Sequence, residues 1–150
     1  MLLQRLSISV LLATAIACPC LADETTLTFP DLFGRWKVRR ELESAPITAG
    51  EVEERKPLGK TFTISADAII TPWRQPPCVP RHIKMEFVDT KAELEENWRV
   101  TMSGLGLAKG SLKPRMQLMD AGCAIALIVN RDVLVWSGGS GFNYLATRLR

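Results

Sequence analysis

The 150-residue chain is poor in the residues from which catalytic, metal and nucleic-acid sites are most often built. It has a single histidine, His82, and only 7% aromatic residues, and its formal net charge is +3. So small a charge does not indicate a nucleic-acid partner. No spacing of histidine, cysteine or acidic residues matches a catalytic or metal-binding motif. The sequence therefore predicts a non-catalytic protein with no metal and no cofactor.

After its first residues the chain also lacks an apolar run long enough for a transmembrane helix. Residues 1–22 have the pattern of an export signal. Arg5 supplies a short positive region, residues 6–17 are apolar, and small residues follow before Asp23. We expect a signal peptide over 1–22 and a single domain over 23–150, located in the periplasm or secreted.

A second interpretation of the same region is a lipid anchor. The run Ala15-Ile16-Ala17-Cys18 resembles a lipobox, in which Cys18 would become the lipidated first residue of an outer-membrane lipoprotein. Ala15 stands where leucine is usual, so plain cleavage is the favoured interpretation.

Few cysteines remain beyond the signal, only Cys78 and Cys123. An oxidising compartment favours a disulfide between them. The loop that it closes is long, and loop entropy corresponds to about 4 kcal/mol of stability. Two buried free thiols, or a catalytic thiol served by His82, are the less favoured alternatives.

Alternating side chains predict short β-strands along the whole chain. In the first strand Gly34, Trp36, Val38 and Leu42 share one face, and Arg35, Lys37, Arg39 and Glu41 share the other. Gly34 would let another piece of backbone close over it, because glycine has no Cβ. Further strands are expected at 60–66, 68–71, 81–88, 98–102, 112–118, 123–129, 133–136 and 142–149.

Two helical turns interrupt this pattern. Thr-x-x-Glu pairs predict them near 49–56 and 91–97. Pro114 predicts that 112–118 is an edge or bulged strand, and the apolar run 123–129 a strand buried on both faces. Strands without βαβ alternation indicate an all-β fold, a small antiparallel barrel of about eight strands with one or two short helices.

The two ends of the strand pattern resemble a known family. Gly34-x-Trp36 on the first strand is similar to the Gly-x-Trp of lipocalins and other calycin-like barrels, and residues 144–148 resemble their closing strand. In that family a late arginine packs across the first-strand tryptophan. The resemblance implies a lipocalin-like barrel with Arg148 over Trp36.

Two sets of residues are candidates for binding. Trp36, Trp98, Trp136 and Phe62 would form the core or line a ligand cavity. Trp73, in the proline-rich segment 72–80, is expected to be exposed and to contact a partner. Arg35, Lys37 and Arg39 would form a basic stripe, with Tyr144, Arg148 and Arg150 beside them on the last strand. This places Arg148 differently from the resemblance, and the sequence leaves both placements open. Charges that keep a sheet edge soluble are the alternative meaning of the stripe.

These features favour an exported binding protein that holds a small apolar ligand or docks on an envelope protein, in the manner of small periplasmic inhibitors. The alternatives are an envelope-acting hydrolase and a structural accessory lipoprotein anchored at Cys18.

Overall fold

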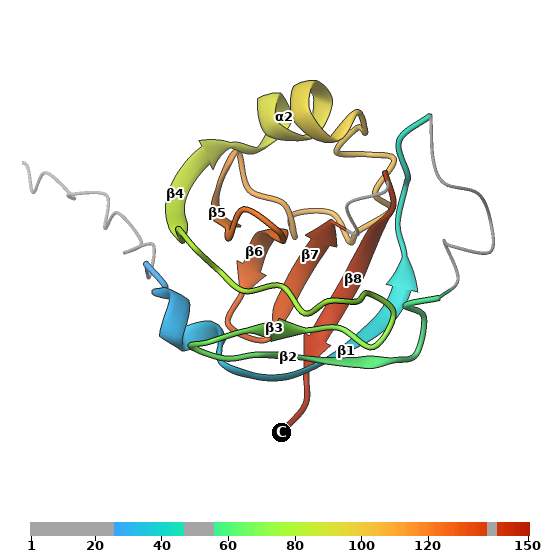
Figure 1. Ribbon diagram of the computed structural model, residues 1–150. Coiled ribbons are helices and arrows are strands. Elements are labelled where there is room, and N and C mark those ends of the chain that lie inside the picture. Colours follow the sequence, from blue (N-terminus) through green and yellow to red (C-terminus); the bar gives the residue numbers. More distant parts are fainter. Residues whose placement is uncertain (1–25, 47–55, 138–140) are drawn as a thin grey trace, which may run out of the picture.

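The computed structural model describes residues 26–46, 56–137 and 141–150. Their strands form one antiparallel sheet in the order β3-β2-β1-β8-β7-β6-β5-β4. The sheet curls into a half-barrel, with β2 and β3 crossing the lower front of the view and the helix at the top (Figure 1). The predicted all-β class is confirmed. The expected signal peptide, Cys18 and most of the helix predicted at 49–56 lie outside the described residues.

The elements follow one another as short segments. They are η1 (Phe29–Leu32), β1 (Gly34–Glu41), β2 (Thr61–Ile64), β3 (Ile69–Ile70), β4 (Lys84–Asp89), α2 (Thr90–Ala92), η2 (Glu93–Trp98), β5 (Arg115–Asp120), β6 (Ile125–Asn130), β7 (Val133–Ser137) and β8 (Asn143–Arg148). Across the described ranges, no helix has the length and apolar character needed to cross a membrane.

One predicted strand is wrong. Residues 98–102 alternate as a strand would, but Trp98 is instead the last residue of η2, a π-helical turn. Arg99 then takes a left-handed backbone with φ of 58°, which ends the helix. Leu94 and Trp98 are four residues apart, and this helical spacing buries both on one side.

The sheet is buried on both faces. Its concave face holds a core of Trp36, Phe62, Trp136 and Tyr144. The opposite face of β5–β8 packs against the helix and the segment that follows it, through Leu94, Trp98 and Leu105 among others. In β6, Ala126 and Ile128 belong to the first core and Leu127 to the second. The prediction that this strand is buried on both faces is confirmed.

A β-bulge corrects the predicted faces of the first strand. The register between β1 and β8 shifts between Val38 and Arg40. One extra residue reverses the alternation that follows. Leu42 therefore packs in the second core and does not share a face with Trp36 and Val38.

The predicted facing of the last strand is also wrong. Tyr144 is buried in the concave core, and Leu145 packs on the opposite face. Tyr144 therefore does not contribute to an outer basic stripe.

The sheet edges also differ from the prediction. Pro114 lies just before β5, so its missing N–H removes no bond from the strand, and its carbonyl accepts a bond from Thr90. β5 consequently lies between β4 and β6 and is not an edge. The edges are β3 and β4, and the segment 71–83 spans the gap between them.

The predicted disulfide is present. Cys78 and Cys123 are bonded, with their Cα atoms 5.7 Å apart. Cys78 also pairs with Ile69 through two backbone hydrogen bonds. These bonds form a one-residue antiparallel bridge along the outer side of β3. The spanning segment is therefore fixed both to β3 and to the turn between β5 and β6.

Candidate functional site

The four aromatic residues predicted to form the core or to line a ligand cavity lie in two separate cores. Phe62 stacks on Trp36, with ring centroids 6.5 Å apart, and lies 4.7 Å from Trp136. These three side chains are buried and fill the concave side of the sheet. Trp98 packs on the opposite face, where its indole N–H donates to Glu93. Their arrangement is that of packed cores.

Arg148 covers the first-strand tryptophan. Its guanidinium carbon lies 4.6 Å from the Trp36 ring centroid, and its N–H groups donate to the carbonyls of Asp31, Phe33 and Arg131. Of the two placements that the sequence left open, the structure has the one over Trp36. Arg148 is therefore not part of an outer stripe.

Gly34 admits this arginine. Its φ is +136°, and a Cβ there would lie 3.3 Å from an Arg148 guanidinium nitrogen. The expectation that backbone closes over Gly34 is corrected, because the approaching group is a side chain.

The helical turn before β1 completes this end of the half-barrel. Trp36 donates its indole N–H to the Leu32 carbonyl at 2.9 Å. Asp31 accepts bonds from the hydroxyl and backbone N–H of Thr28 and from Arg131. The Thr28 bonds, with the Arg131 charge, hold the pKa of Asp31 below its ordinary value. Hydrogen bonds therefore hold η1, β1 and β8 together at this end.

A small hollow lies on the concave side next to this end, because its lining residues Leu27 and Asn130 adjoin Thr28 and Arg131 along the chain. It measures about 80 Å³, and its lining includes Leu27, Phe87, Arg115 and Gln117. The Gln117 amide bonds both the N–H and the carbonyl of Leu27, which fixes the N-terminal segment over the hollow. Pockets for small organic ligands usually measure several hundred Å³. This hollow is too small for such a ligand.

The basic stripe on β1 is shorter than predicted. Arg35 and Arg39 are exposed and Lys37 is half-buried on the outer face. Arg39 donates to the Thr147 hydroxyl at 2.7 Å, so its guanidinium is held against β8. Without Arg148 and Tyr144, the predicted stripe retains these three cations and Arg150, which is exposed and pairs with Asp132 at 3.0 Å.

The prediction that Trp73 is exposed is wrong. It is half-buried and meets Phe62 edge-on, with centroids 5.9 Å apart. Among the described residues, the exposed large hydrophobic side chains are instead Ile70, Val79 and Ile83, with exposed fractions of 50%, 62% and 39%. All three belong to β3 and the spanning segment.

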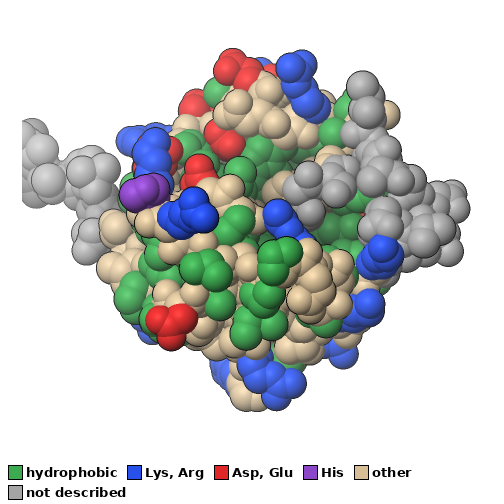
Figure 2. Space-filling model, in the orientation of Figure 1, with side chains coloured by type: hydrophobic (Ala, Val, Ile, Leu, Met, Phe, Trp, Pro, Cys, Tyr) green, Lys and Arg blue, Asp and Glu red, His purple; other side chains and the backbone are tan. Residues whose placement is uncertain are grey.

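None of these three residues was a candidate in the sequence analysis, and the strand pairing explains why Ile70 and Val79 are exposed. Ile69 and Cys78 face each other and are both buried. Because side chains alternate along paired strands, Ile70, Pro77 and Val79 turn outward together. We call this set, with the exposed cations Arg74 and Arg81 near it, the spanning-segment face. Figure 2 shows hydrophobic side chains over the middle of this side of the molecule with lysine and arginine side chains among them.

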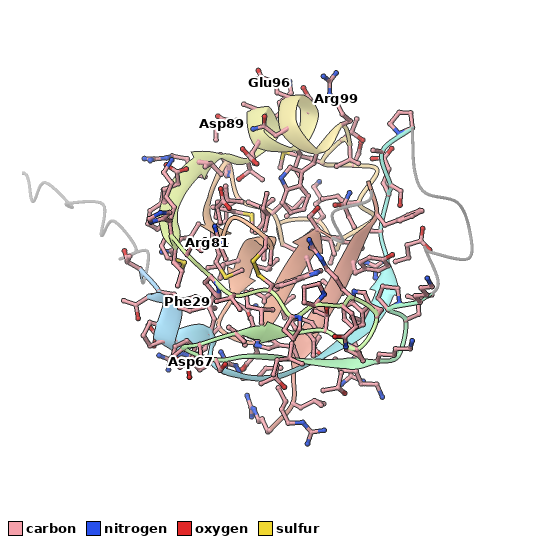
Figure 3. The ribbon with its side chains drawn as sticks, viewed as in Figure 1. Phe29, Asp67, Arg81, Asp89, Glu96 and Arg99 are labelled. Atoms are coloured by element: carbon pink, nitrogen blue, oxygen red, sulfur yellow. A yellow bond between two sulfur atoms is a disulfide. The ribbon has the colours of Figure 1, made fainter. Side chains whose placement is uncertain are left out.

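Among the acidic residues of the described part of the chain, one has a structural role and two others lie at opposite ends of the molecule. Glu93 accepts bonds from Asn97 and Trp98, a structural use of its carboxylate. Glu96 lies on the helix at the opposite end of the molecule from Asp67 (Figure 3). His82 is exposed, and no group of three or more histidine, cysteine or acidic residues in the described ranges is placed to hold a metal ion.

Comparison of the chain with protein-family models, with curated proteins and with solved structures found no match. The features of the molecule that bear on its function are therefore the exposed spanning-segment face and the filled core.

Proposed function

We propose that this chain is an exported, non-catalytic binding protein that docks on a protein partner through the spanning-segment face. The observation that carries the proposal is that Ile70 and Val79, with exposed fractions of 50% and 62%, turn outward together beside the buried pair Ile69 and Cys78. Scattered surface hydrophobics are ordinary, but a gathered and rigidly held set is typical of an interaction surface. The disulfide supports export to an oxidising compartment, the periplasm or the exterior.

Rigidity favours this face as a docking surface. Cys78 is fixed by the disulfide and by its pairing with Ile69, and Arg74 donates to the Cys123 carbonyl at 2.8 Å. A surface that is already ordered loses little conformational entropy when it binds. Small inhibitors of periplasmic enzymes use disulfide-tied segments in this way, and we place the chain in that class.

The chemistry of the face indicates the chemistry of the partner. An apolar centre formed by Ile70, Pro77 and Val79 would contact apolar side chains, and the exposed Arg74 and Arg81 would meet acidic groups at its rim. A small apolar ligand is the less favoured occupant, because Trp36, Phe62 and Trp136 fill the space that it would need.

A site-specific crosslinking experiment tests the proposal. A photo-reactive phenylalanine analogue replaces Val79 in the full-length protein, expressed in its source cell, and the matched control carries it at the exposed Lys109. We expect one protein adduct of defined mass from the Val79 variant and none from the control. Native mass spectrometry of the purified complex then identifies the adduct as a protein or a small molecule.

A second variant shows whether the apolar centre itself carries affinity. Ile70→Ser together with Val79→Ser truncates two exposed side chains that lie outside both cores, so the fold is expected to persist by circular dichroism. Binding of the captured partner should weaken at least tenfold, which is about 1.4 kcal/mol. Equal crosslinking at Val79 and Lys109, or unchanged affinity in the double variant, would refute the docking function.

A further inference from the structure

The strand β4 is an edge of the sheet whose outer side carries no backbone hydrogen bond within the described residues. The pairing with β5 fixes which groups point outward. Thr90 donates to the Pro114 carbonyl, in the same uninterrupted register that pairs Val88 with Met116 and Glu86 with Leu118. In an antiparallel ladder, alternate residues bond to the neighbouring strand. The even-numbered residues of β4 therefore bond to β5.

The pairing of β5 with β6 independently confirms which residues of β4 bond to β5. Ala121 donates to the Ala124 carbonyl, in the register that pairs Met119 with Ala126. The odd-numbered residues of β5 thus bond to β6, which leaves the even-numbered ones for β4. It follows that the N–H and C=O groups of Met85 and Phe87, and of Ile83 just before the strand, point away from the sheet.

The side chains of β4 are complementary to those of β4 in a second copy of the chain. A strand can pair with a second copy of itself only antiparallel about a two-fold axis. With the axis at Met85, Ile83 faces Phe87 of the other copy through outward backbone groups, and Lys84 faces Glu86. Moving the axis to residue 84 or 86 would place Lys84 against Lys84 or Glu86 against Glu86, and like charges directly opposite are destabilising.

We propose that two copies of this chain pair along β4 about a two-fold axis at Met85, which joins two half-barrels into one continuous sheet. Lys84 and Glu86 already form an ion pair at 2.6 Å within one chain, and both remain partly exposed. In the dimer each would gain an opposite charge across the axis. Ile83, which is 39% exposed, would be covered by Phe87 of the second copy. The pairing satisfies a backbone edge that is otherwise open to aggregation.

The inference does not depend on the proposed docking function. Ile70 and Val79 lie outside the paired strand, and the variants below leave them unchanged. Loss of dimerisation and loss of partner binding are therefore separate outcomes.

Sedimentation equilibrium on charge-reversed variants tests the pairing. We expect the wild-type protein to be dimeric, and Lys84→Glu and Glu86→Lys each to be monomeric with unchanged circular dichroism. An equimolar mixture of the two variants should form a heterodimer, because every facing pair is then opposite in sign. The variant that carries both reversals should dimerise alone. A single-copy wild-type protein at about 1 mM, or a dimer that both single reversals leave intact, would overturn the proposal.

Cysteine crosslinking tests the register. Facing residues of a hydrogen-bonded antiparallel pair have Cα atoms about 5.5 Å apart, a distance that suits a disulfide. Met85→Cys should therefore give a crosslinked dimer on mild oxidation. Phe87→Cys is the matched control, because the axis places the two copies of that residue four positions apart, and it should give none. Crosslinking of Phe87→Cys in preference to Met85→Cys would reject this register.

Discussion

At the scale of single residues, Arg148 connects the first strand, the turn before it and the last strand. Its guanidinium lies over Trp36 and donates to three carbonyls, and its side chain is only 17% exposed. Removing a buried charged donor leaves its acceptors without a partner, which costs more than the bonds themselves contribute. Arg148 therefore stabilises the end of the half-barrel where the first and last strands meet.

We expect Arg148→Ala to reduce the free energy of unfolding by about 3 kcal/mol, from the lost hydrogen bonds and the lost cation–π contact. Urea denaturation followed by tryptophan fluorescence measures the change. Arg150→Ala is the matched control, because that arginine is 87% exposed and pairs only with Asp132 at the surface. Arg150→Ala should reduce the free energy of unfolding by less than about 0.5 kcal/mol. Equal costs for the two variants would show that the contact with Trp36 has no structural importance.

Asp31 should contribute to acid sensitivity. The Thr28 bonds and Arg131 lower the pKa of this carboxyl from its ordinary value of 3.8. The folded protein therefore binds the proton less readily than the unfolded chain. The resulting stabilisation is complete above about pH 4 and is lost as the pH falls through the lowered pKa. Asp31→Asn should flatten the fall in thermal stability below about pH 4. Glu95→Gln, on the exposed side of η2, serves as the control and should leave the acid limb unchanged.

At the scale of elements, the N-terminus of α2 is capped by a different residue from the one that the sequence predicts. Asp89 is the N-cap, and its carboxylate accepts the N–H of Ala92 at 2.9 Å. The Thr90–Glu93 spacing predicted a cap one residue later, and this prediction is wrong. Thr90 is fully buried, and its hydroxyl has no hydrogen-bond partner among the residues that the structure describes. The backbone N–H of Thr90 is bound to Pro114, so Thr90 belongs to the ladder, and the helix begins only where β4 ends.

Two neighbouring substitutions should therefore act in opposite directions. Asp89→Ala should cost about 1 kcal/mol, because an N–H at the start of the helix loses its acceptor. Thr90→Val replaces an unsatisfied buried hydroxyl by a methyl of similar size, and stability should stay equal or rise by about 1 kcal/mol. Chemical denaturation of both variants gives the comparison. If Thr90→Val were the more damaging change, the predicted capping pair would be the correct description.

At the scale of the whole molecule, alternation predicted most of the strands because burial of one face imposes a period of two. Phe62 and Ile64 of β2 are buried and their neighbours are half-buried. Alternation predicted the wrong faces where a β-bulge interrupts a strand. The bulge between Val38 and Arg40 has no sequence signature, since both residues that follow Val38 are charged and exposed.

The candidate docking face could be predicted only in part. Its disulfide followed from the cysteine count, and Trp73 was the residue expected to be exposed. The structure exposes Val79 instead, because the pairing of Ile69 with Cys78 decides which side chains turn outward. That pairing joins residues across a proline-rich segment in which no periodic pattern exists, so the sequence carries no signal for it.

The disulfide has the largest expected effect on the whole molecule. It closes a loop with a sequence separation of 45 residues and ties the segment after β3 to the turn between β5 and β6. Loop entropy predicts that removing the bond lowers the free energy of unfolding by about 4 kcal/mol. Urea denaturation with and without reductant measures this loss, and intact-mass analysis confirms that the bond has been broken. The double variant Cys78→Ser with Cys123→Ser should show the same loss and no response to reductant. If reduction left the wild-type transition unchanged, the bond would not contribute to the rigidity on which the spanning-segment face depends.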